Sequence, residues 1–136
     1  METVSYRGKI TTDPIKILIL EHDMNDLELL QYELRKMGIP FVARAVRLKR
    51  EFVNAMLGFK PDVILSDYCL PSFDGIEAFE LRQNLAPEIP FIFVSGNIEE
   101  EYSLLLKQQG LTDYVRKDNL LSLQSKLNRI LSSPVG

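Results

Sequence analysis

Apolar residues along this chain follow two alternating patterns, short continuous runs and longer stretches at helical spacing. The continuous runs are typical of strands that are buried on both faces of a parallel sheet. They predict strands at residues 15–20, 63–65, 91–94 and 114–115, with a looser alternation over 41–46. Apolar positions three and four apart predict helices over about 24–37, 52–58, 76–85, 98–109 and 120–131.

The alternation of strands and helices predicts the fold class. Five strand-helix units with short connections predict an α/β domain with a doubly wound parallel sheet, because right-handed crossovers place helices on both of its faces. Residues 1–14 are polar and end at Asp13-Pro14, so we expect a flexible lead-in there. The domain itself is expected over residues 15–132, followed by a short tail over 133–136.

The most informative stretch surrounds Asp67. The apolar run before it ends abruptly at Ser66, which places Asp67 at the carboxyl end of an inner strand. Ser72 and Gly75 downstream form a helix-entry pattern. In open α/β sheets ligands bind in the crevice outside the carboxyl ends of the strands. A carboxylate at the tip of a buried strand is costly without a counter-charge, so we expect a cation or a covalent modification at Asp67.

Three further polar residues follow other strands and are expected to converge on the same crevice. Glu21 follows the first strand, Ser95 the fourth and Lys117 the fifth. Carboxylates supply hard oxygen ligands for Mg²⁺, a hydroxyl hydrogen-bonds a phosphoryl oxygen, and an ammonium neutralises its charge. Phosphoryl transfer needs mainly such positioning and charge stabilisation. Asp67 is therefore the expected nucleophile, forming an aspartyl phosphate.

Composition narrows the alternatives. The 136 residues with 46% hydrophobic content are enough for one domain with one substantial core. The net charge of -3 shows no overall excess of basic residues, so direct nucleic-acid binding is not expected. The single cysteine, Cys69, excludes an internal disulfide and fits a reducing compartment. No stretch approaches the length of a membrane span or a signal peptide, so we expect a cytoplasmic protein without membrane insertion.

These residues stand in motifs that resemble the receiver domain of bacterial two-component response regulators. The motifs are the acidic stretch after ILIL, the block VILSDYCLP with DG downstream, FVSG, and DYVRKD, in the family's order. The resemblance covers nearly everything from about residue 15 to residue 131. It implies a flavodoxin-like (βα)5 sheet with strand order 2-1-3-4-5.

The resemblance also implies roles for individual residues. Asp67 is expected to accept a phosphoryl group from the phosphohistidine of a sensor histidine kinase or phosphotransfer protein. Ser95 and Lys117 are expected to contact that group, and Tyr114 to change rotamer on activation, although plain packing is an equal alternative for this tyrosine. The backbone carbonyl of Cys69 is expected to join the Mg²⁺ ligands. Such a protein is a signalling phosphoacceptor in a phosphorelay, not an enzyme, with an output partner that the sequence does not identify.

The chain departs from the family after the first strand, where two successive acids are usual. Glu21 is followed by His22, and Mg²⁺ strongly prefers oxygen to imidazole, so we expect weaker Mg²⁺ binding than in an ordinary receiver. Asp23 is an alternative metal ligand, although its place before a helix favours a role as N-cap. The departure leaves a second hypothesis open, a pseudo-receiver that binds partners independently of phosphorylation.

Overall fold

Five parallel strands form the central sheet of the computed structural model, which describes residues 4–6, 9–11, 13–68, 73–96 and 99–132. The strands are β3 (Ile15–Leu20), β4 (Phe41–Val46), β5 (Val63–Ser66), β6 (Phe91–Ser95) and β7 (Asp113–Arg116). Their order across the sheet is β4-β3-β5-β6-β7, and every pair of neighbours is parallel. In chain order this is 2-1-3-4-5, which confirms the predicted topology.

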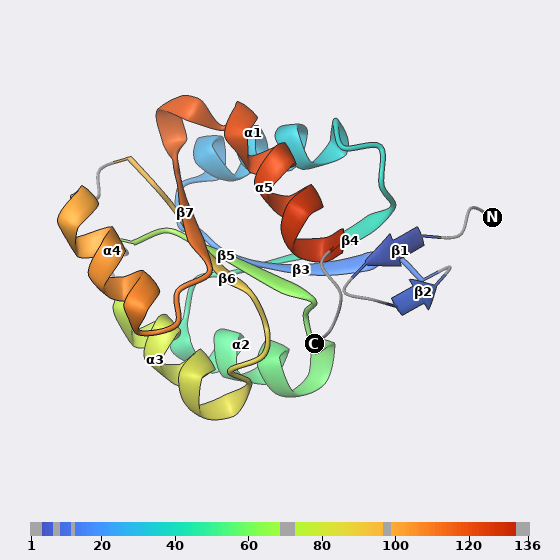
Figure 1. The fold of residues 1–136 in the computed structure, drawn as a ribbon. Coiled ribbons are helices and arrows are strands. Elements are labelled where there is room, and N and C mark those ends of the chain that lie inside the picture. Colours follow the sequence, from blue (N-terminus) through green and yellow to red (C-terminus); the bar gives the residue numbers. More distant parts are fainter. Residues whose placement is uncertain (1–3, 7–8, 12, 69–72, 97–98, 133–136) are drawn as a thin grey trace.

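Helices cover both faces of this sheet (Figure 1). They are α1 (Met24–Arg35), α2 (Lys49–Asn54), α3 (Gly75–Leu85), α4 (Glu100–Gln108) and α5 (Leu121–Ser132). The helices α1 and α5 lie on one face, and α2, α3 and α4 lie on the other. The predicted doubly wound arrangement is therefore confirmed.

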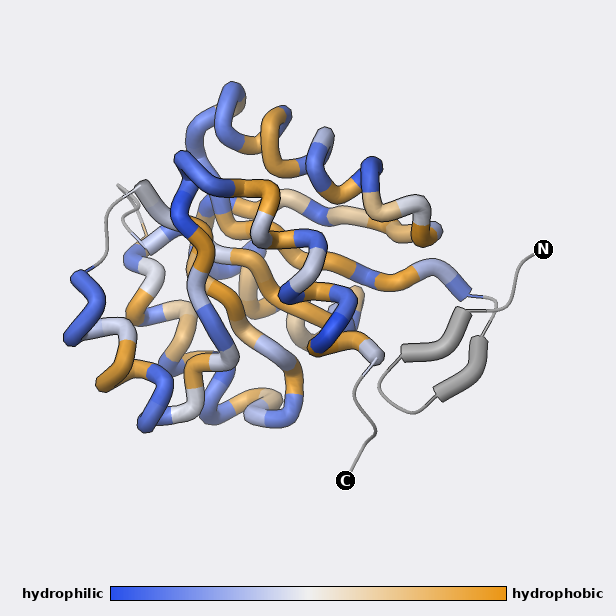
Figure 2. The backbone as a smooth tube through the Cα atoms, turned by 45° about the horizontal axis from the view of Figure 1, so that its top comes forward, coloured by the Kyte–Doolittle hydropathy of each residue, from blue (hydrophilic) through white to orange (hydrophobic). Residues whose placement is uncertain are grey.

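Each face of the sheet has its own hydrophobic core, because the strands alternate their side chains between two helix layers. Phe52, Phe79 and Leu106 pack on one face, whereas Leu34 and Leu127 pack on the other. All five side chains are almost completely buried, and burial of each contributes roughly 1.5–3 kcal/mol. Figure 2 shows largely hydrophobic strands between helices in which hydrophobic and hydrophilic residues alternate. The sheet is thus a rigid support for the loops at its carboxyl edge.

The second helix ends differently from the prediction of a stop at Gly58. After α2 the chain makes a π-helical turn over Ala55–Phe59, and Lys60 N donates to Ala55 O at 2.9 Å. Lys60 itself has a φ of 54°, so a left-handed residue ends the helix instead of the glycine.

The third helix begins against the end of β5. Its N-cap is Asp74, whose Oδ1 accepts from the Ile76 amide at 2.7 Å, while the predicted Ser72 lies outside the described residues. Gly75 packs so closely that an added Cβ would overlap the carbonyl oxygen of Asp67 and lie 2.8 Å from that of Tyr68. Glycine is therefore required here for the close approach of helix and strand.

Two further details did not follow from the spacing of apolar residues. On α4 the side chain of Leu105 is 48% exposed, whereas Ser103 is fully buried and donates from its hydroxyl to Glu100 O at 2.7 Å. Within the predicted lead-in over residues 1–14, β1 (Val4–Tyr6) and β2 (Lys9–Thr11) pair antiparallel beside the sheet (Figure 1). The apolar pattern did not predict this hairpin.

Candidate phosphoacceptor site

The ends of three strands bring Glu21, Asp67 and Lys117 together. Lys117 Nζ lies 2.7 Å from Glu21 Oε1 and 3.1 Å from Asp67 Oδ2. Glu21 follows β3, Asp67 follows β5, and Lys117 follows β7, so each side chain starts at the carboxyl edge of the sheet. Both carboxylates are buried, with exposed fractions of 4% and 8% for their side chains. The predicted convergence of these three residues is present in the structure.

A fourth charged residue, Asp26, belongs to the same cluster and was missed by the sequence analysis. Asp26 Oδ2 accepts from Lys117 Nζ at 2.7 Å, and its side chain is 36% exposed. It comes from the first turn of α1, whose apolar positions alone were used to predict that helix. The sequence nonetheless offered a signal for Asp26. It stands three residues after the N-cap Asp23, so it lies in the first turn of a helix that begins directly after Glu21.

Burial and charge act in opposite directions on the groups of this cluster. Burial is the largest cause that raises the pKa of Glu21, and the negative charge of Asp67 adds to it against the opposing effect of Lys117. Burial alone would lower the pKa of Lys117, but its hydrogen bonds to Asp26, Glu21 and Asp67 raise it well above its usual value. Lys117 therefore stays protonated as an ammonium. The three carboxylates of Glu21, Asp26 and Asp67 surround this one positive charge.

The residues after Glu21 have distinct positions. Glu21 Oε2 accepts from the backbone amides of His22 and Asp23 at 3.0 and 3.3 Å. His22 Nδ1 lies 3.6 Å from the same oxygen, and its side chain is 42% exposed. Asp23 is the N-cap of α1, since its Oδ1 accepts from the Asp26 amide at 3.0 Å. Of the two roles considered for Asp23, the structure has the capping role.

Potential metal ligands cluster beside the lysine. One ligand atom from each of Glu21, His22 and Asp67 lies within 4.8 Å of the others. Two carboxylates in such a group fit a hard divalent cation such as Mg²⁺, whereas the imidazole does not. The expected contribution of the Cys69 carbonyl lies outside the described residues.

The remaining predicted residues, Ser95 and Tyr114, come from β6 and β7. Ser95 is buried at the carboxyl end of β6, the strand next to β5 and therefore to Asp67. Tyr114 is half-buried near the start of β7, and the ammonium groups of Lys107 and Lys126 lie 5.5 and 5.4 Å from its ring centroid. Ser95 thus lies at the crevice, and Tyr114 lies on the surface between α4 and α5.

Next to Tyr114 lies a second ionic cluster, around Asp113. Lys107, Lys126 and Arg129 place nitrogen atoms 3.1, 3.3 and 3.3 Å from the Asp113 carboxylate. Burial opposes ionisation of Asp113, but the Tyr114 amide and the two lysines outweigh it and lower the pKa of Asp113. On the surface made by α4, β7 and α5, this cluster thus has an excess of positive charge.

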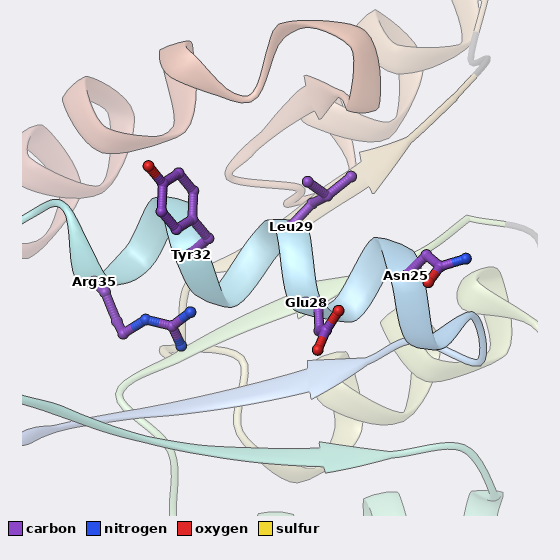
Figure 3. Close-up of a pocket in the computed structure, with 5 residues that line it drawn as sticks. All are labelled: Asn25, Glu28, Leu29, Tyr32 and Arg35. Carbon is purple, nitrogen blue, oxygen red and sulfur yellow. The ribbon is translucent and has the colours of Figure 1, made fainter.

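A separate hollow of about 430 Å³ lies along the outer side of α1 (Figure 3). It is lined by Asn25, Glu28, Leu29, Tyr32 and Arg35. These side chains project from the same helix, and Glu28 and Arg35 point away from α5.

No helix in the described part of the chain is long and apolar enough to cross a bilayer.

Comparison with solved structures defines the class of fold. The chain resembles a response regulator receiver domain protein from Clostridium thermocellum with a TM-score of 0.74 and 18% identity, over 85% of this chain and 93% of that one. It also resembles the Mn(2+)-bound form of response regulator Rcp1 with a TM-score of 0.69 and 22% identity, over 85% and 93% of the two chains. These similarities show the receiver fold.

Sequence comparison then establishes the family. The family model for the response regulator receiver domain matches residues 17–128, so the chain belongs to that family. The transcriptional regulatory protein YvcP of Bacillus subtilis (strain 168) is 30% identical over 125 residues, which are 89% of this chain and 50% of that protein. The chain therefore spans about half the length of this curated relative. The predicted receiver resemblance is confirmed at the level of the family.

Proposed function

We propose that this chain is a phosphoacceptor receiver in a two-component phosphorelay and that Asp67 takes the phosphoryl group from a partner histidine kinase or phosphotransfer protein. The observation that carries the proposal is the contact of Lys117 Nζ with Asp67 Oδ2 at 3.1 Å, at the carboxyl end of β5 and beside Glu21. This arrangement places a permanent cation next to a buried carboxylate, where a phosphoryl group needs charge compensation.

In the proposed reaction an oxygen of the Asp67 carboxylate attacks the phosphorus of a phosphohistidine. A new O–P bond forms as the P–N bond breaks, and the imidazole nitrogen keeps the electron pair of the broken bond. Lys117 pairs with a phosphoryl oxygen, and Ser95, at the end of the next strand, donates its hydroxyl to another. In this proposal the protein acts as a signalling phosphoacceptor and not as an enzyme, so the only reaction that follows phosphorylation is slow hydrolysis of the aspartyl phosphate.

The side chains of Glu21 and Asp67 are the proposed ligands of Mg²⁺, together with the backbone carbonyl of Cys69. Mg²⁺, when bound, supplies positive charge to the phosphoryl oxygens. His22 lies where a second acid is usual, and Asp23 is engaged as the cap of α1. We therefore infer that divalent cations bind more weakly here than in receivers with two acids.

Phosphorylation is proposed to act on the surface made by α4, β7 and α5. Added charge at Asp67 draws Ser95 inward, and Tyr114 changes position between its two lysines. Tyr102 lies on the same side, and its ring centroid is 5.9 Å from that of Tyr68, the residue after Asp67. This contact gives a short physical connection between the site and the proposed output surface.

The direct test is autophosphorylation of the purified protein by acetyl phosphate with Mg²⁺, measured by intact mass. The wild type is expected to gain one phosphoryl group, and Asp67→Ala none. Asp62→Ala is the control, since this aspartate precedes β5 and its Oδ2 accepts from the Lys16 amide at 2.9 Å, at the opposite end of the strand. No phosphoryl transfer to the wild type from any donor would reject the proposal.

His22 in the metal-ligand group supports a second candidate function, a pseudo-receiver that binds partners without phosphorylation. Its signature is partner binding that is identical for the wild type and Asp67→Ala. The presence of Asp67, Ser95 and Lys117 together favours the phosphoacceptor. Binding that requires phosphorylated Asp67 would eliminate the pseudo-receiver.

A further inference from the structure

The ammonium of Lys117 is shared among three carboxylates, and the sharing is uneven. Its distances to Glu21 Oε1 and Asp26 Oδ2 are both 2.7 Å, whereas the distance to Asp67 Oδ2 is 3.1 Å. An ammonium has three N–H donors, so each carboxylate oxygen takes one of them. The longest contact is the one to the proposed phosphoacceptor.

Hydrogen bonds in the first turn of α1 hold Asp26 in position for its contact with Lys117. The Asp26 amide donates to the cap residue Asp23 at 3.0 Å, which fixes its backbone in the first turn of α1. The Asp23 amide in turn donates a hydrogen bond to Glu21 Oε2 at 3.3 Å. The Asp26 side chain therefore need not reach back to the cap, and it extends to Lys117 instead.

Apolar side chains lie on one side of the pair formed by Asp26 and Lys117. A cavity of about 20 Å³ lies beside these two residues, and Leu29, Leu30, Val94 and Leu120 contribute to its lining together with Glu21. The side chains of Asp26 and Lys117 are 36% and 21% exposed, so the pair is partly shielded from water. Partial shielding strengthens the attraction between the two charges relative to a fully exposed pair.

Asp26 lies outside the group of potential metal ligands, which comprises Glu21, His22 and Asp67 among the described residues. Its effect on a bound cation must then act largely through Lys117. Without Asp26, the third N–H of the ammonium would turn to Glu21 or Asp67, and the lysine would compete with the cation for those oxygens.

We propose that Asp26 is a positioning residue that draws the Lys117 ammonium toward α1, so that the lysine competes less with a divalent cation for Glu21 and Asp67. This inference rests on the proposed metal-dependent function of the same site. It gives the chain a partial substitute for the acid that is missing at His22, because a lysine held toward Asp26 repels and displaces the cation less.

The test is the affinity of the purified, unphosphorylated protein for Mn²⁺, measured by the electron paramagnetic resonance signal of free Mn²⁺. Asp26→Asn is expected to weaken binding about tenfold, the low end of the loss seen when an outer partner of a metal ligand is removed. Glu28→Gln is the matched control, since it removes the same charge from the outer side of α1 (Figure 3) and is expected to bind Mn²⁺ like the wild type.

A double-mutant cycle with Lys117→Met separates action through the lysine from direct action on the cation. Asp26→Asn should have no further effect on Mn²⁺ affinity in the Lys117→Met background, at a temperature where circular dichroism shows both variants folded. An undiminished effect there, or unchanged affinity of Asp26→Asn alone, would overturn the positioning role. Absence of Mn²⁺ binding by the wild type would instead remove the metal from the proposed function itself.

Discussion

Two ionic clusters lie at opposite ends of β7 and have opposite charge ratios. At the carboxyl end, three carboxylates, those of Glu21, Asp26 and Asp67, surround the single ammonium of Lys117. At the other end, one carboxylate, that of Asp113, is surrounded by Lys107, Lys126 and Arg129. Each cluster thus contains a central ion with three partners of opposite sign.

The two clusters differ in the sign and the burial of their surplus charge. Around Asp113 the carboxylate is the central ion, its pKa is lowered, and its cationic partners are 26–70% exposed. Around Lys117 the surplus charges are buried carboxylates, and the pKa of Glu21 is raised. Buried negative charge without full compensation is the condition that a divalent cation relieves. The Lys117 cluster is therefore the one suited to bind a cation.

The largest expected effect comes from removing one lysine from each cluster. Lys117→Met should lower the free energy of unfolding by about 3 kcal/mol, because two buried carboxylates lose the ammonium that they share. Lys126→Met should lower it by less than about 1 kcal/mol, because Asp113 keeps two cations. The two side chains are similarly exposed, at 21% and 26%. Urea unfolding at pH 7 without divalent cations measures both, and equal losses would contradict the comparison.

A smaller loss is expected when the central carboxylate of the other cluster is neutralised. Asp113→Asn should lower the free energy of unfolding by about 2 kcal/mol at pH 7, the worth of hydrogen bonds to a charged group. The folded-state pKa of Asp113 lies below the ordinary value of 3.8. Its stabilisation is therefore fully present above pH 3.8 and is lost as the pH falls through the lower folded-state pKa.

The measurement is urea unfolding of the wild type and Asp113→Asn from pH 7 down to pH 3. The difference between them should shrink below pH 3.8. Asp118→Asn, which breaks the exposed pair with Arg116 at 2.9 Å, serves as control and should change stability little. A difference that is independent of pH would show that packing, not charge, is responsible for the role of Asp113.

Adding a carboxylate to the acid-rich cluster sharpens the comparison further. His22→Asp should raise the affinity for Mg²⁺ about tenfold, or about 1.4 kcal/mol, because an oxygen ligand replaces an imidazole. Without Mg²⁺ the same variant should be less stable than the wild type, since it adds like charge to Glu21. Isothermal titration calorimetry measures the affinity. A wild-type affinity typical of receivers, unchanged by this substitution, would contradict the role given to His22.

The smallest expected effect is a gain in stability. Glu21→Gln should raise the free energy of unfolding by about 1 kcal/mol at pH 7 without Mg²⁺, because it removes a buried charge and its repulsion with the Asp67 carboxylate. The folded-state pKa of Glu21 is raised above 4.5, so its ionisation costs stability above that folded-state pKa and costs nothing below pH 4.5. The gain in stability should therefore shrink as the pH falls through the folded-state pKa of Glu21, and it should be absent below pH 4.5. Thermal unfolding at a series of pH values measures it.

Glu51→Gln provides the contrast for this gain. Glu51 accepts from the amides of Arg47 and Leu48 at 3.0 Å each, and these bonds lower its pKa. Its neutralisation should therefore destabilise the protein at pH 7. A loss of stability in Glu21→Gln similar to that in Glu51→Gln would show that the Lys117 cluster is not short of positive charge.

The sequence was sufficient to predict the sheet and the residues at its strand ends. Carboxyl ends of parallel strands meet at one edge, so the positions of Glu21, Asp67 and Lys117 followed from the apolar runs alone. Asp26 and Asp113 could not be predicted in the same way. The contact of Asp26 depends on the rotation of α1 about its axis, and the cations around Asp113 come from two different helices.

Other differences have equally local causes. The buried position of Ser103 did not follow from hydrophobicity, because the hydroxyl is satisfied by a carbonyl of its own helix. The end of the second helix at Lys60 depends on a π-helical turn, which shifts the end beyond the glycine that normally marks it. Such contacts depend on tertiary packing, which a pattern of apolar positions does not encode.

The missing side chain at Gly75 bears on how the proposed phosphorylation of Asp67 would be transmitted. The start of α3 packs directly on the backbone carbonyls of Asp67 and Tyr68, so that helix and strand end are tightly joined. If Asp67 is phosphorylated as proposed, we expect movement on the opposite side of Asp67, at the end of β6 and along α4 and β7. The expected asymmetry thus arises at a single position where no Cβ fits.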